Sequence, residues 1–140
     1  MWLFYAFGAA VFAALVAIFG KLGLKTIDST LATTIRGIIM AVFLILVSLS
    51  MRKFDGFHFN DIQTKDWVLI ILSGVAGAMS WLFYFVALKY GDASKVVAID
   101  RLSIVFVVII AGIFLAEGFS WKSISGAILM AGGAILISLK

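Results

Sequence analysis

The sequence contains no cysteine and no proline, only one histidine, and few charged residues for its length. The absence of cysteine excludes a disulfide framework and a thiolate metal site. His58 lies in a polar loop without a second histidine, so we expect no metal there. Charged residues make up 13% of the 140 residues, whereas soluble domains typically have about 25%. This deficit excludes a soluble protein.

Motifs of catalysis and of cofactor binding are also missing. We find no Ser-His-Asp set, no P-loop and no dinucleotide-binding fingerprint. Gly74 and Gly77 lie inside an apolar run, where they cannot cradle a phosphate. The net charge of +4 does not indicate nucleic acid as a partner, because the basic residues stand one or two at a time between apolar runs. We therefore expect no catalytic residue, no cofactor and no enzyme.

Long apolar runs dominate the chain instead. Hydrophobic residues make up 64% of it, and the mean hydropathy is +1.21. Five runs are long enough for a transmembrane helix of about 20 residues, so we predict an all-α integral membrane protein, a single domain over 1–140 with five transmembrane helices. The first run lacks the basic start of a signal peptide, and we expect it to be retained as a helix. The predicted helices are 2–21, 31–51, 67–89, 96–116 and 122–139.

The basic residues in the loops hardly determine the orientation of these helices in the membrane. Five helices place the two termini on opposite faces of the membrane. One face has five basic residues, Lys21, Lys25, Lys89, Lys95 and Lys140; the other has four, Arg52, Lys53, Lys65 and Lys122. Orientation follows the difference in Lys and Arg between the faces. A difference of one is compatible with insertion both ways up, or with a single orientation that other features determine.

Three charged residues lie inside the predicted helices. A charge at mid-helix costs about 2.5 to 3.5 kcal/mol on insertion scales and often marks a pathway or relay. Arg36 and Asp100 lie about one turn inside helices that start from the same face, so we predict that they form a coupled pair. Arg101 is about 100° around the helix from Asp100. We assign coupling or gating to Asp100, Arg36 and Arg101, with a structural ion pair as the alternative.

A stripe of small and aromatic residues runs along the third helix. Gly77, Ser80 and Tyr84 are spaced by three and four residues and share one face, which Trp81 borders. Such a face suits contact with an amphiphilic solute, and we predict that Trp81, Tyr84, Ser80, Gly77 and Arg36 bind substrate. Close helix packing through small residues is the alternative for this stripe. In the fifth helix, Gly126 and Gly133 are the candidate interface between protomers.

The order of several short motifs resembles the five-helix unit of the EamA-type drug/metabolite transporters. These motifs are Ala32 to Gly37 around Arg36, the aromatic run 81–88 leading into 91–94, Leu115-Ala116-Glu117, and the glycines of 126–133. Most relatives fuse two such units in inverted orientation and move metabolites, amino acids or drugs. The proline that members often have near the start of helix four is absent here, as is a proline-made hinge.

The resemblance implies a secondary transporter, an exporter or exchanger of a small metabolite or amphiphilic solute, with no cofactor. With one unit per chain, we expect an antiparallel, dual-topology homodimer that works by alternating access in a prokaryotic cytoplasmic (inner) membrane. The expected partners are a second copy, the solute and the lipid bilayer. The alternatives are a non-transporting accessory or structural subunit and a lipid-carrier translocation partner; a membrane enzyme is less favoured.

Overall fold

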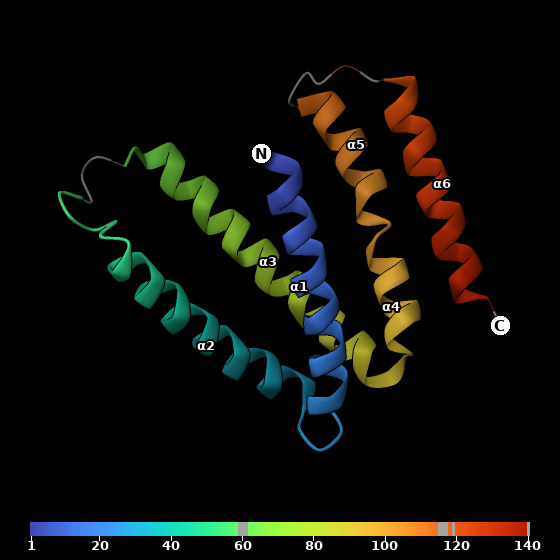
Figure 1. The fold of residues 1–140 in the computed structure, drawn as a ribbon, viewed down its shortest axis with the longest axis horizontal. Coiled ribbons are helices and arrows are strands. Elements are labelled where there is room, and N and C mark those ends of the chain that lie inside the picture. Colours follow the sequence, from blue (N-terminus) through green and yellow to red (C-terminus); the bar gives the residue numbers. More distant parts are fainter. Residues whose placement is uncertain (59–61, 115–117, 119, 140) are drawn as a thin grey trace. The chain divides into compact units, whose positions relative to one another are not determined.

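The computed structural model describes residues 1–58, 62–114, 118 and 120–139, and Figure 1 shows its helices in chain order. The helices are α1 (Trp2–Gly23), α2 (Ser29–Ser50), α3 (Thr64–Tyr90), α4 (Ala93–Asp100), α5 (Ser103–Phe114) and α6 (Trp121–Ser138). No strand occurs in the residues described.

Five segments of the described chain are long and apolar enough to cross a membrane. α1, α2, α3 and α6 each supply one, and α4 with α5 supplies the remaining one, Ala93–Phe114. Their average hydropathy stays high because charge is confined to helix ends and to the three intramembrane residues. The predicted all-α membrane protein with five spans is therefore confirmed, and the chain is a multi-pass membrane protein.

The chain forms two compact units. Unit 1 comprises Met1–Lys21 and Tyr90–Lys140, and unit 2 comprises Leu22–Lys89. Unit 1 therefore holds nearly all of α1 together with α4, α5 and α6, and unit 2 holds α2 and α3.

In unit 2, Asp28 sets the start of α2. Its carboxylate accepts hydrogen bonds from the backbone N–H groups of Thr30 and Leu31, at 2.9 and 3.1 Å, as an N-cap does. The hydrogen bonds from the Leu31 and Thr30 N–H groups lower the pKa of Asp28; desolvation opposes them, and the charge of Lys89 adds to the lowering. The cap therefore stays ionised at neutral pH. Because Asp28 caps the helix, α2 begins at Ser29, two residues before the predicted start.

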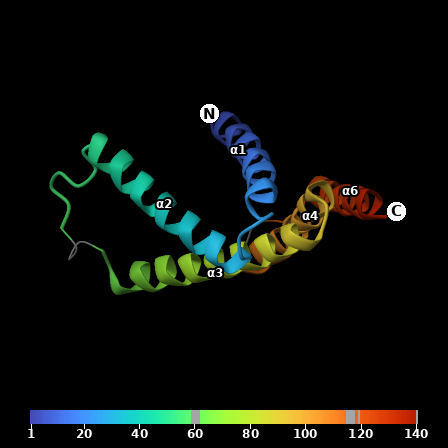
Figure 2. The same ribbon diagram turned by 90° about the horizontal axis from the view of Figure 1, so that it is seen from below.

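α2 and α3 form the body of unit 2. Figures 1 and 2 both show the start of α2 beside the end of α3, with the helices moving apart toward the loop that connects them. Phe85 and Leu88, near the end of α3, are buried. Because the helices are closest near this end, Arg36, the eighth residue of α2, lies in the part of the hairpin where they contact one another.

In unit 1, the fourth span is divided. The sequence pattern predicts one continuous helix, whereas α4 ends at Asp100 and α5 begins at Ser103. The Leu102 N–H bonds to the Ile99 carbonyl at 2.9 Å, and Ile104 and Val105 also bond three residues back. Such a tightened turn inside a helix often marks a hinge. The helix is therefore interrupted at its charged residues without any proline.

α6 packs against both α4 and α5. Ser120 caps α6 by accepting a hydrogen bond from the Lys122 N–H at 3.3 Å. The ammonium of Lys21, near the end of α1, donates to the carbonyl oxygen of Gly91 at 2.8 Å. This bond links α1 to the turn before α4 within unit 1.

Candidate functional site

Arg36 is the charged residue of α2 that lies inside the span. Its side chain is half-buried. Among the residues described in unit 2, no carboxylate forms an ion pair with Arg36 and no group accepts a hydrogen bond from it. Asp28 lies eight residues earlier, about 12 Å along the helix, and uses its carboxylate as a cap. Within the described part of unit 2, Arg36 is therefore held by contacts other than ion pairs and hydrogen bonds.

The guanidinium of Arg36 stacks on two aromatic rings of α3. Its central carbon lies 3.5 Å from the ring centroid of Trp81 and 5.1 Å from that of Phe85. Both distances fall within the range of a cation–π interaction, for which tryptophan is the best partner. Such contacts are worth about 0.5 to 2 kcal/mol depending on desolvation. The rings thus replace part of the hydration that Arg36 loses in the span.

Trp81 and Phe85 belong to an aromatic cluster on one face of α3. The ring centroids of Trp81, Tyr84 and Phe85 lie 5.7 to 6.0 Å apart, with the rings tilted or edge to face. Residues three and four apart meet in this way on a helix. The cluster fixes the Trp81 ring and with it the plane on which the guanidinium rests.

A small cleft adjoins this stack. It has a volume of about 150 Å³ and is lined by Thr33, Arg36, Gly37 and Met40 of α2 and by Ala78 and Trp81 of α3. The hydroxyl of Thr33 donates to the carbonyl of Ser29 at 2.7 Å, which leaves its oxygen able to accept a hydrogen bond. The cleft therefore combines one cation, one hydroxyl acceptor and an otherwise apolar wall.

The predicted substrate residues are only partly brought together. Arg36 and Trp81 line the cleft, and Tyr84 is half-buried in the aromatic cluster beside it. Ser80 is exposed and Gly77 half-buried, and neither lines the cleft. Their role in binding substrate stays a prediction. A side chain added at Gly77 would meet nothing within 4 Å, so close packing does not explain this glycine within unit 2.

Sequence reasoning missed Phe85, Met40 and Ala78. Phe85 follows Trp81 by one helical turn, and Met40 follows Arg36 by one turn. For Phe85 and Met40, the available signal was their i, i+4 spacing from Trp81 and Arg36, which the sequence had already singled out. An apolar residue at such a position has no distinguishing chemistry in the sequence, which is why these residues gave no indication of a site.

Asp100 and Arg101 lie at the interruption of the fourth span. Asp100 is the last residue of α4, Arg101 is its C-cap, and both are exposed in unit 1. Arg36 belongs to unit 2, so the predicted pairing of Arg36 with Asp100 stays a prediction. Leu115, Ala116 and Glu117, the motif expected at the end of the fourth span, lie outside the described residues.

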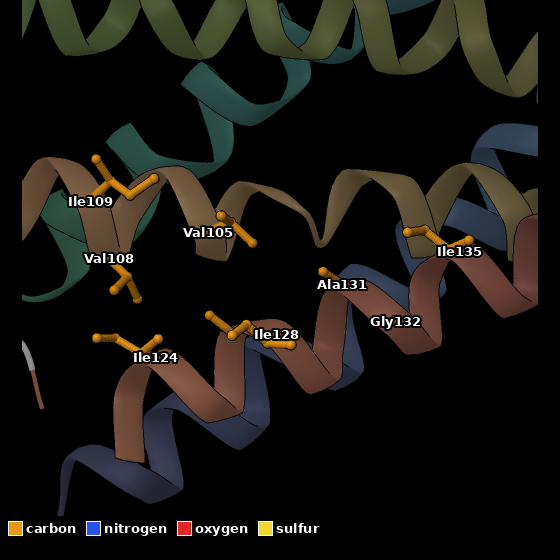
Figure 3. A pocket seen from close by; sticks show the side chains of 9 residues that line it. Val105, Val108, Ile109, Ile124, Ile128, Ala131, Gly132 and Ile135 are labelled. Carbon is orange, nitrogen blue, oxygen red and sulfur yellow. The ribbon is translucent and has the colours of Figure 1, made fainter. Parts of the chain in front are cut away.

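A second, larger concavity lies between α5 and α6 in unit 1. This groove has a volume of about 580 Å³, and Figure 3 shows Val108 of α5 and Ile124 of α6 pointing toward one another across it. It offers no charge or hydroxyl to orient a polar solute. Gly132, rather than Gly126 or Gly133, is among its lining residues. The lining residues are Val105, Val108, Ile109, Ile124, Ala127, Ile128, Ala131, Gly132 and Ile135.

The fold and the cleft define a multi-pass membrane protein with a charged, aromatic cleft between two of its spans, α2 and α3. The sequence matches the EamA-like transporter family over residues 1–139. It is also 37% identical over 138 residues to a protein of Sinorhizobium sp. described as an uncharacterized transporter in the cobO 3' region, covering 99% of this chain and 96% of that protein. The chain belongs to the EamA-like transporter family. No solved structure matches it significantly.

The cleft can be tested by its access to water, because a chain without cysteine allows one introduced thiol to be followed alone. We expect Gly37→Cys, in the cleft wall, to react faster with a hydrophilic thiol reagent than Ile38→Cys. A side chain at Gly37 meets nothing within 4 Å, whereas Ile38 lies at a similar depth about 100° further around the helix and does not line the cleft. Labelling rates in membranes provide the measurement. Equal rates, or a faster Ile38→Cys, would contradict a water-accessible cleft.

Proposed function

We propose that this protein is a secondary transporter in which the cleft beside Arg36 and Trp81 holds the solute. The observation that carries the proposal is the stacked guanidinium inside a membrane span, facing a cleft. An ionisable residue at such a depth generally marks a substrate or ion path. Aromatic walls with a few polar groups are typical of sites for small molecules.

The size of the cleft favours a small metabolite over a bulky drug. Sites for drug-sized ligands enclose about 300 to 1,000 Å³, whereas this cleft has about 150 Å³. At about 30 Å³ per water molecule, that volume equals about five waters. A small metabolite, or the polar head of a longer amphiphile, is the occupant of matching size.

The proposed working form is an antiparallel homodimer. A single unit with an odd number of spans supplies half of an inverted repeat, and a second copy inserted the other way up supplies the other half. The nearly equal numbers of basic loop residues on the two faces permit both insertions. The cleft of each copy would then open alternately to either side, for export or exchange across a prokaryotic cytoplasmic membrane.

We propose that Asp100 and Arg101 take part in coupling or gating. They stand where the fourth span is interrupted, and interrupted helices form coupling sites in many transporters. If Asp100 carries a proton during transport, the Asp100→Asn protein loses the pH dependence of flux. Unchanged pH dependence in that variant would remove Asp100 from the coupling step.

Transport should depend on the aromatic wall of the cleft. Trp81→Ala removes the ring beneath Arg36, and Tyr84→Ala removes the neighbouring ring, so we expect both to reduce solute flux in proteoliposomes while the protein stays folded. Phe83→Ala is the matched control, because Phe83 lies on the same helix and is 70% exposed. Flux equal to that of the unmodified protein in both cleft variants would remove the rings from the solute site. No flux of any solute would instead favour a non-transporting subunit.

Dual topology is tested by a reporter at the C-terminus. We expect it on both faces of the membrane in comparable amounts, because the loops differ by a single basic residue. Adding two lysines to the loop after α1, beside Lys25, should tip the balance, because it raises the difference in basic residues between the two faces from one to three, while two added glutamines should not. A reporter found almost wholly on one face in the unmodified protein would contradict the antiparallel dimer.

A further inference from the structure

The cleft beside Arg36 has a chemical preference that follows from how the guanidinium is held. Stacking on Trp81 at 3.5 Å uses the flat face of the group. The five N–H donors of an arginine lie in the plane of the guanidinium and point outward from its edge. Stacking therefore leaves those donors available while fixing the direction in which they point.

No described group in unit 2 uses these donors. The unit's described carboxylates lie away from the cleft: Asp28 caps α2, Asp55 lies in the following loop, and Asp66 lies in the first turn of α3. None of them forms an ion pair with Arg36. The local charge at the cleft is consequently positive, and a charge in an apolar span is costly without a partner. A bound anion offsets that cost, whereas a bound cation adds to it.

The arrangement of the N–H donors of Arg36 favours one class of anion. A guanidinium edge binds a planar carboxylate through two parallel hydrogen bonds. The cleft volume of about 150 Å³ suits such a group with a short apolar tail, and Met40, Ala78 and Gly37 supply the apolar wall. The Thr33 hydroxyl already donates its hydrogen to the Ser29 carbonyl, so its oxygen can only accept a further hydrogen bond and adds no second anion site.

We infer that the cleft binds small organic carboxylates, with the carboxylate on the outer edge of Arg36 and the tail against the α2 and α3 wall. This inference rests on the proposed function, since it names the solute class of the same site. It predicts selection by charge: a carboxylate binds, and an ammonium or alcohol of equal size does not.

The test uses Trp81 as its own reporter. Trp2→Phe, Trp67→Phe and Trp121→Phe leave Trp81 as the one tryptophan, and none of the three replaced residues lines the cleft. The protein is placed in nanodiscs of zwitterionic lipid and titrated with propionate, propylammonium and propanol, which do not absorb in the range of tryptophan emission. We expect propionate alone to change the emission in a saturable way. Thermal unfolding of the unmodified protein in the same solutes gives a second readout.

Variants of Arg36 decide whether the response arises at the cleft. Loss of a bidentate, charge-assisted contact should weaken propionate binding by about tenfold or more in Arg36→Gln. Arg36→Lys keeps the charge but lacks the planar array of donors. Its affinity for propionate should lie between those of the unmodified protein and Arg36→Gln. Arg52→Gln, in the loop after α2, is the control and should bind as the unmodified protein does. A response of equal size in Arg36→Gln, or to all three solutes, overturns the inference.

A lipid phosphate could supply the same oxyanion chemistry, and the nanodisc composition separates the two sources. If added anionic lipid changes the Trp81 emission through Arg36 while propionate has no effect, the occupant is a lipid and the inference is overturned. Flux assays separate this inference from the proposed function. If the protein transports cations or neutral solutes but does not bind propionate, the transporter proposal stands and the inference of a carboxylate site is overturned. If propionate binds but no solute is transported, the carboxylate site stands and the transporter proposal is overturned.

Discussion

The contact between Arg36 and Trp81 is the interaction on which the site depends. A guanidinium in an apolar span needs a partner, and within the α2–α3 hairpin that partner is an aromatic face 3.5 Å away. An ion pair with an internal carboxylate would consume the N–H donors, whereas stacking leaves them available. The charge is thus accommodated without being neutralised. A cleft that is positive, small and walled by apolar residues is the result.

The fourth span is interrupted at the two residues proposed for coupling or gating, Asp100 and Arg101. Membrane helices tolerate a break where neighbouring groups satisfy the freed backbone, and here the turn at Asp100 and Arg101 does so with bonds to residues three positions back. The chain contains no proline, so the break does not depend on one. The interruption falls at Asp100 and Arg101, between two stretches rich in β-branched residues, whose helix propensity is lower.

Much of the fold could be predicted from the sequence, because a span is recognised from the length of an apolar run. The five spans follow from such runs, with ends displaced by a few residues where caps such as Asp28 decide the start. The break after Asp100 could not be predicted, since no residue there forbids a helix. Of the candidate site, Arg36 and Trp81, which line the cleft, were singled out from the sequence, and their role in binding stays a prediction. Their contact, and the part played by Phe85, depend on how α2 meets α3, which periodicity within one helix does not determine.

A double-mutant cycle measures directly whether Arg36 and Trp81 act on one another. Arg36→Gln, Trp81→Leu and the double variant are compared by thermal or denaturant unfolding in detergent, with Arg36→Gln and Phe83→Leu as a control cycle. We expect a coupling of about 0.5 to 2 kcal/mol for the first pair and additivity for the second, because the Phe83 ring forms no cation–π contact with Arg36. Additivity of Arg36→Gln and Trp81→Leu, within the error of the control cycle, would contradict the stacked site.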